Sequence, residues 1–379
     1  MLDNFDAPFP GKYHSLKWSR YQGKDVIPLW LADTDFPVSP KILSSIKHRL
    51  ELSHLNYGII PEELKDIICQ YCFSRYRWKI LPEWVVFTPS ITIGLNIVRT
   101  LVTTTNNKHA GVTFIPTYHR LMKGVAAIPF QHYLYPLQLS SEQWHMDLSM
   151  VDTVPVQAGV YFLCNPHNPV GRAYTKEELI SIAELCIAKQ WLICSDEAHC
   201  DLLLGDHQHI PIASLLPEIS RHTITLMSPG KAHGICGLGF AFAVIENPHL
   251  RSVYQSVCDG LVGDVNVLSI PAAMAAYTEN TYWLQQQQLI LERNASEVFN
   301  RINAIPYLSM QQVEATFLAW IDVSKLSVDD PQRFFESHGV GLADGHLFGV
   351  KGFLRLSFGC SWHTLDEALS RIEHACSTL

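Results

Sequence analysis

Residues 160–196 read VYFLCNPHNPVGRAYTKEELISIAELCIAKQWLICSD, and this stretch decides the fold class. It opens on an apolar run at 160–164, passes through an Asn/Pro loop into a helical pattern at 175–189, and closes on a second apolar run at 191–195. Thr175, followed three residues later by Glu178, has the pattern of a capping box, which predicts the start of a helix. A strand, a helix and a strand in this order predict a parallel sheet.

The same alternation continues on both sides of this stretch. Further strands are expected at 85–87, 111–115 and 223–227, and a further helix at 93–101. We therefore expect an α/β fold with a mostly parallel central sheet and helices on both faces. Ligands bind at the carboxyl ends of the strands in such sheets. The polar residues that follow these strands should therefore converge: Ser90, Thr92, Tyr118, Asn165, Asn168, Asp196, His199, Ser228 and Lys231.

The C-terminal part has a different pattern. Strands are expected at 316–321 and 353–358, followed by a helix at 364–375 with Thr364 as its N-cap and Glu367 completing a capping box. These elements predict a smaller α+β domain. Because 379 residues exceed what one core usually holds, we expect a large domain at 41–280 and a small domain at 281–379, which the segment 1–40 joins.

Composition excludes several classes of protein. Apolar residues make up 47% and charged residues 17%, as in packed globular proteins. The net charge of −8 argues against a general surface for nucleic acid or anionic membranes. No signal peptide or membrane-length apolar run is visible, so a cytoplasmic protein without a membrane or nucleic-acid partner is expected.

Cysteine usage gives no sign of a disulfide framework or a metal site. The ten cysteines are best interpreted as reduced thiols. Cys69 and Cys72 form a close pair, but they lie in a helical apolar pattern and lack a second Cys or His pair nearby. Zinc needs four ligands, so packing in a helix is the preferred interpretation and no metal is expected.

Two residues could carry chemistry with a carbonyl cofactor. Lys231 follows a strand and lies in a Gly-rich apolar stretch, where desolvation lowers a lysine pKa and makes the amine nucleophilic. A lone lysine is otherwise a solvated surface residue. Asp196 ends a strand and could hold a pyridinium nitrogen, although a capping role explains such an aspartate equally well.

Other residues suit the binding of a ligand, and each has a structural alternative. Arg355 lies in an apolar strand and could clamp a substrate carboxylate or form a structural salt bridge. The turn at 90–92 precedes a helix and could bind a phosphate or simply cap the helix. Tyr118 could lie against an aromatic cofactor or pack in the core. The loop at 165–171 could aim an Asn amide at a ligand or be an ordinary Pro-rich turn.

Taken together, these residues resemble the class I/II aminotransferase family of fold-type I enzymes, which use pyridoxal 5′-phosphate (PLP). Within that family the chain is most similar to the cystathionine β-lyase or C–S lyase branch. The resemblance covers essentially the whole chain. The stretches that carry it are Lys17-Trp18, PLWLADTDF at 28–36, NPHNPVG at 165–171, SDEAHCDL at 195–202, HIPIASL at 209–215, and the pattern from Phe348-Gly349 through Arg355 to Phe358-Gly359.

The resemblance implies a role for each matching residue. Lys231 would carry PLP as a Schiff base and move the substrate proton, while Arg355 would bind the α-carboxylate of an amino acid. Tyr57 would reach the phosphate of a neighbouring subunit, which implies a homodimer. The remaining residues would bind PLP: Asp196 at the ring nitrogen, Asn168 and His199 near the ring hydroxyl, Tyr118 on the ring face, and Ser90, Ile91, Thr92 and Ser228 at the phosphate.

Some positions depart from the family pattern. Gly230 precedes the lysine where Ser or Thr is usual, and His233, Gly234 and Cys236 follow it and could alter the substrate or reaction. Many aminotransferases have a phosphate-binding Arg at the position of Gly239, and its absence favours a lyase. The expected reaction is α,β-elimination from cystathionine or another cysteine S-conjugate. An aminotransferase, a PLP-dependent oxidase or decarboxylase, and a non-catalytic regulator remain as alternatives.

Overall fold

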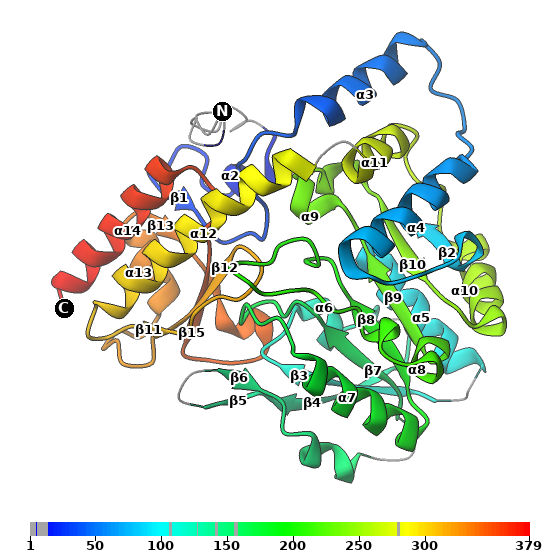
Figure 1. Ribbon diagram of the computed structural model, residues 1–379. Coiled ribbons are helices and arrows are strands. Elements are labelled where there is room, and N and C mark those ends of the chain that lie inside the picture. The colour runs from blue at the N-terminus through cyan, green and yellow to red at the C-terminus, as the bar shows by residue number, and fades with distance from the viewer. Residues whose placement is uncertain are drawn as a thin grey trace.

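The computed structural model describes residue 5 and residues 14–105, 108–126, 128–140, 143–154, 158–278 and 281–379 (Figure 1). Its main sheet has seven strands, all parallel except the antiparallel β10. This confirms the predicted α/β fold with a mostly parallel sheet. In spatial order the strands are β2 (Val85–Thr88), β10 (Ala241–Val244), β9 (Thr223–Met227), β8 (Leu192–Asp196), β7 (Ala158–Cys164), β3 (Ala110–Ile115) and β4 (Gln131–Pro136).

Helices cover both faces of this sheet, as the central strand β7 illustrates. Val160 and Phe162 pack in one cluster with α5 (Ile91–Thr105) and α10 (Pro248–Leu261). Tyr161 and Leu163 point to the opposite face and pack in a second cluster with α7 (Lys176–Lys189). Successive side chains of a strand point to opposite faces, so a strand that is apolar throughout needs cover on both sides.

Further helices complete this part of the chain. They are α3 (Pro40–Glu51), α4 (Glu62–Tyr76), α6 (His119–Met122), α8 (Pro217–Arg221), α9 (Gly230–His233) and α11 (Ser269–Thr278). Short 3₁₀ helices are η1 (Pro82–Trp84), η2 (Leu148–Thr153), η3 (Ile212–Ser214), η4 (Cys236–Leu238) and η5 (Gly345–Phe348), and a separate hairpin pairs β5 (Gln138–Leu139) with β6 (Trp144–His145).

A smaller antiparallel sheet lies beside the main one, and its strands in spatial order are β11 (Ser309–Met310), β12 (Leu318–Asp322), β15 (Phe353–Ser357) and β14 (Ala343–Asp344). The helices α12 (Thr281–Asn303), α13 (Pro331–Ser337) and α14 (Trp362–Ser377) accompany it. The N-terminal residues Leu29, Ala32 and Phe36 pack in one apolar cluster with residues of this smaller sheet and of these helices. The division into domains at 1–40, 41–280 and 281–379 stays a prediction.

The N-terminal segment also pairs with the C-terminal part through its backbone. Strand β1 (Ile27–Pro28) runs parallel to β13 (Val340–Gly341), and it follows the short helix α2 (Leu16–Ser19). The segment directly after β1 then crosses towards the carboxyl edge of the main sheet, where its backbone meets residues of the site described below.

Helix starts follow the sequence prediction in one case and not in another. At α7 the capping box of Thr175 and Glu178 is present, as predicted. At α14 the predicted N-cap at Thr364 is wrong, because the Ser361 side chain accepts the backbone N–H of Thr364 at 3.3 Å and the helix begins at Trp362. Glu367 consequently completes no capping box there and instead accepts a hydrogen bond from Arg371.

One strand boundary also differs from its prediction. The strand expected at 316–321 begins at Leu318, since Thr316 has a left-handed φ of 76° that does not fit a strand. The Thr316 hydroxyl accepts the backbone N–H of Leu318 at 3.1 Å. The other predicted strands and the predicted helices exist, with ends displaced by a few residues.

The cysteine pair lies on α4, where Cys72 is buried in an apolar cluster and Cys69 packs against that cluster. Among the described residues, no group of three or more His, Cys, Asp or Glu side chains could hold a metal ion. No helix in the described part of the chain has the length and apolarity needed to cross a bilayer.

Candidate active site

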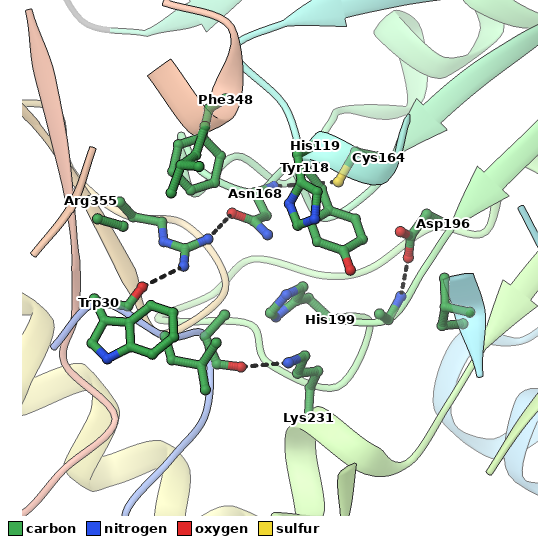
Figure 2. A pocket seen from close by; sticks show the side chains of 16 residues that line it. Trp30, Tyr118, His119, Cys164, Asn168, Asp196, His199, Lys231, Phe348 and Arg355 are labelled. Atoms are coloured by element: carbon green, nitrogen blue, oxygen red, sulfur yellow. Dashed lines mark hydrogen bonds between the residues drawn. The ribbon is translucent and has the colours of Figure 1, made fainter. Parts of the chain in front are cut away.

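The loops at the carboxyl edge of the main sheet surround a cavity of about 240 Å³ (Figure 2). Parallel strands end at the same edge, so the loops after β3, β7, β8 and β9 bring their side chains together. The predicted residues that line this cavity are Ile91, Tyr118, Asn168, Asp196, His199, Lys231 and Arg355. The expected convergence is therefore found for Tyr118, Asn168, Asp196, His199 and Lys231, whereas Asn165 does not line the cavity and its amide donates to the Ile210 oxygen at 3.1 Å.

Lys231 enters the cavity from α9, which begins directly after β9 and Ser228. Its Nζ donates a hydrogen bond to the backbone oxygen of Ala32 in the N-terminal segment. A Cβ at Gly230 would lie 3.1 Å from both the Ser228 hydroxyl and the Cys236 sulfur. These contacts are tighter than ordinary van der Waals distances, so a side chain at this position would require one of the two neighbours to move.

Asp196 is the last residue of β8 and is buried at the edge of the cavity. Its Oδ1 accepts the backbone N–H of Ala198 at 3.2 Å. Burial raises the pKa of Asp196 to about 6, although the Ala198 N–H and the Lys231 amine act in the opposite direction. Among the described residues no cation forms an ion pair with it, so this carboxylate is available to a cationic ligand.

Arg355 reaches the cavity from β15 of the smaller sheet, and its guanidinium is held on several sides. Nη1 donates to Asn168 Oδ1 at 2.9 Å, Nη2 donates to the Trp30 backbone oxygen at 3.0 Å, and the group lies 4.5 Å from the centre of the Phe348 ring. Burial lowers the pKa of Arg355 to about 9. No carboxylate of the described residues forms an ion pair with Arg355, which leaves the guanidinium charge without an anionic partner in this part of the chain.

Two rings lie between these charged groups. Tyr118 follows β3, and its hydroxyl is 3.5 Å from the Thr92 hydroxyl. His199 is buried, and burial together with Lys231 and Arg355 lowers its pKa to about 3, so the ring is neutral near pH 7. Figure 2 shows both rings in the space bounded by Asn168, Asp196 and Lys231.

The residues expected at the phosphate lie at the edge of the cavity or outside it. Ser90 accepts the Ile93 N–H at 3.3 Å at the start of α5, and Ser228 bonds the Phe240 oxygen at 2.7 Å and the Gly230 N–H at 3.1 Å. Of the turn at 90–92, only Ile91 lines the cavity, and Ser228 does not. Tyr57 is 99% exposed on the segment between α3 and α4, so this chain does not bring it to its own site.

The sequence interpretation assigned no role to several side chains that line the cavity, among them Trp30, His119 and Phe348. Trp30 and Phe348 lie within the stretches that carry the family resemblance, and His119 directly follows Tyr118, so a signal existed for each. His233, in contrast, does not line the cavity. It is buried beside the edge of the Tyr277 ring, with 6.4 Å between the two ring centres.

The chemistry of these groups fits PLP. The Lys231 amine can form a bond with a carbonyl group, and the buried Asp196 carboxylate has no cation partner among the described residues. Both groups line one cavity. The Nδ1 of His199 and the Nε of Arg355 are buried polar atoms without a hydrogen-bond partner among the described residues, and such atoms usually have one. The start of α5 supplies the N–H groups that suit a phosphate.

Comparisons with known proteins agree with this arrangement. The family model described as "Aminotransferase class I and II" matches residues 25–372. Cystathionine beta-lyase PatB of Bacillus subtilis (strain 168) is 30% identical, over 96% of this chain and 97% of PatB. A crystal structure of OvoB is 39% identical with a TM-score of 0.96, covering 99% of this chain and all of the other. The PLP-bound C–S lyase of Staphylococcus hominis is 26% identical with a TM-score of 0.90, covering 98% of both chains.

Proposed function

Because the chain belongs to the class I and II aminotransferase family, we propose that it is a PLP-dependent carbon–sulfur lyase. Its substrate would be cystathionine or another cysteine S-conjugate, which it would convert with water to a thiol, pyruvate and ammonia. The names of PatB and of the Staphylococcus hominis C–S lyase support this reaction.

One observation carries the proposal: Lys231, Asp196 and Arg355 line the same cavity although they come from three different strands or their loops. An amine, a carboxylate without a cation partner and a guanidinium without a carboxylate partner are what an amino acid and a pyridine cofactor would need. A structural role would pair these charges with each other or with neighbouring side chains.

PLP, when bound, supplies a carbonyl for the amines and an electron sink that stabilises negative charge at the substrate Cα. Lys231 would hold its carbonyl carbon and Asp196 its ring nitrogen. Asn168 and His199 would lie near the ring hydroxyl, and Tyr118 would contact the ring face. The phosphate would bind at the turn formed by Ser90, Ile91 and Thr92, and near Ser228.

The protein's own groups then act on the substrate. Arg355 binds the α-carboxylate and thereby orients the amino acid. The substrate amine would take the place of Lys231 at the carbonyl carbon, which frees the lysine Nζ. The free Nζ would then remove the proton from Cα as a general base, a role that requires it to lie within hydrogen-bond reach of that proton. Asn168 holds the guanidinium in place through its 2.9 Å bond to Nη1. The bond from Cβ to sulfur breaks, and the sulfur leaves with the electron pair.

An aminotransferase is the second candidate, and the name of the family favours it. Gly239 supports the lyase instead. Its φ of 67° is a left-handed conformation that side-chain-bearing residues rarely adopt, so the local backbone disfavours the arginine that many aminotransferases have there.

We further propose that the protein works as a cytoplasmic homodimer in which Tyr57 reaches the phosphate of the neighbouring site. Tyr57, Ile59 and Leu55 are 99%, 90% and 61% exposed, and a cluster of large apolar side chains on a surface favours contact with another chain. Sedimentation velocity tests this assembly. A monomer at micromolar concentration would contradict it.

The deciding experiment measures pyruvate and free thiol from cystathionine and other cysteine conjugates, with and without an added 2-oxo acid. Pyruvate and thiol without the oxo acid would support the lyase. Amino transfer that occurs only with the oxo acid would refute it in favour of the aminotransferase.

A further inference from the structure

The wall of the cavity offers few hydrogen-bonding groups to the part of the substrate that leaves with sulfur. In the proposed function, Arg355 binds the α-carboxylate of the substrate, and Asp196 and Lys231 bind the cofactor. Of the other large side chains that line the cavity, Leu31, Leu347 and Phe348 are apolar. Trp30 has one donor, and its indole N–H is already bonded to the Lys17 oxygen at 3.1 Å.

His119 is a polar exception among the residues that line the cavity. It begins α6, lines the cavity beside Tyr118 and packs edge-on against that ring, with 4.7 Å between the ring centres. None of the described residues forms a hydrogen bond with its imidazole nitrogens. The ring is half-buried, so it is accessible from the cavity without being fully solvated.

The charges around His119 have one sign. Arg120 and Lys123 follow it on and just after α6, and Arg355 lies across the cavity. Burial and these three cations lower the pKa of His119 below its usual value. The ring is thus a neutral donor near pH 7 in an electropositive surrounding, where an anionic group is attracted and a cationic group is repelled.

We propose that His119 donates a hydrogen bond to an anionic or acceptor group on the substrate's sulfur substituent, so that the enzyme prefers cysteine conjugates with a carboxylate in this position. This inference rests on the proposed lyase function. The apolar wall of Trp30, Leu31, Leu347 and Phe348 would contact the carbon atoms and the sulfur of the same substituent.

The test compares two conjugates of similar length, S-(2-carboxyethyl)cysteine and S-propylcysteine, in the purified holoenzyme. We expect a higher kcat/KM for the carboxylate conjugate, and His119→Phe should lower the ratio of the two values by about tenfold or more, since a hydrogen bond to a charged group is lost. His119→Asn keeps a donor and should restore part of the ratio. His249→Phe, at an exposed position on α10, is the matched control.

A second readout does not depend on turnover. Binding of 2-aminoadipate and norleucine, which have no leaving group, is followed through the cofactor absorbance. Preference for 2-aminoadipate that His119→Phe abolishes would support the role of His119 even if no conjugate is cleaved and the lyase proposal fails. An unchanged ratio in His119→Phe, an equal loss for both conjugates, or no preference for the acidic ligand would overturn the inference.

Discussion

Replacing Arg355 by lysine tests the substrate clamp most directly. The guanidinium is anchored at Asn168 and Trp30, and it presents a planar fork that can bind a carboxylate through two parallel bonds. A lysine keeps the positive charge, but its ammonium group is a point charge that cannot form the two parallel hydrogen bonds to a carboxylate. The loss of one hydrogen bond to a charged group costs about 1.5–3 kcal/mol, which corresponds to about a 10- to 150-fold weaker binding of the amino acid.

This loss should appear mainly in KM, because the carboxylate is bound equally before and during the reaction at Cα. Pyruvate release from cystathionine gives kcat and KM for the wild type and Arg355→Lys, and the melting temperature shows whether the variant is folded. Arg333→Lys is the control, since that side chain is 87% exposed on α13. A KM within threefold of wild type in a folded Arg355→Lys variant would refute the clamp.

Three further predictions concern the lysine, the buried aspartate and the N-cap of α14. Lys231→Ala should lower turnover by at least about 10²–10⁴-fold, because the general base is lost, and turnover near the wild-type rate would contradict the mechanism. Burial raises the pKa of Asp196 to about 6, so spectral titration should show PLP binding weaken as the pH falls below 6 and the carboxyl becomes protonated; a flat profile would contradict this pairing. Ser361→Ala should destabilise the protein by about 1 kcal/mol in urea unfolding, and a larger effect of Thr364→Ala would contradict the observed N-cap.

Much of the main sheet could be predicted because its signals are local. Strand β7 is apolar throughout and is followed by Asn and Pro. The capping box at the start of α7 consists of only two residues, Thr175 and Glu178. The order of these elements then placed Asp196 and Lys231 at one edge without any knowledge of distances. Parallel strands leave little freedom in where their carboxyl ends lie.

The rest depends on contacts between distant parts of the chain, which local patterns do not contain. Thr316 interrupts a strand through its positive φ, and its N–H bonds the Leu202 oxygen at 2.6 Å. Ser361 and Thr364 are both good caps in the sequence, and only the observed bond decides between them. His119 directly follows Tyr118, and only the structure shows that its side chain also lines the cavity.

The N-terminal segment that crosses the site has a consequence for biosynthesis. Its Ala32 oxygen meets Lys231 and its Trp30 oxygen meets Arg355, which is made 124 residues after that lysine. At about 5–20 residues per second, a ribosome needs roughly 6–25 s for this interval. A nascent chain can thus complete the strands proposed to hold the cofactor well before Arg355 exists, so the part of the site proposed to bind the amino acid forms last.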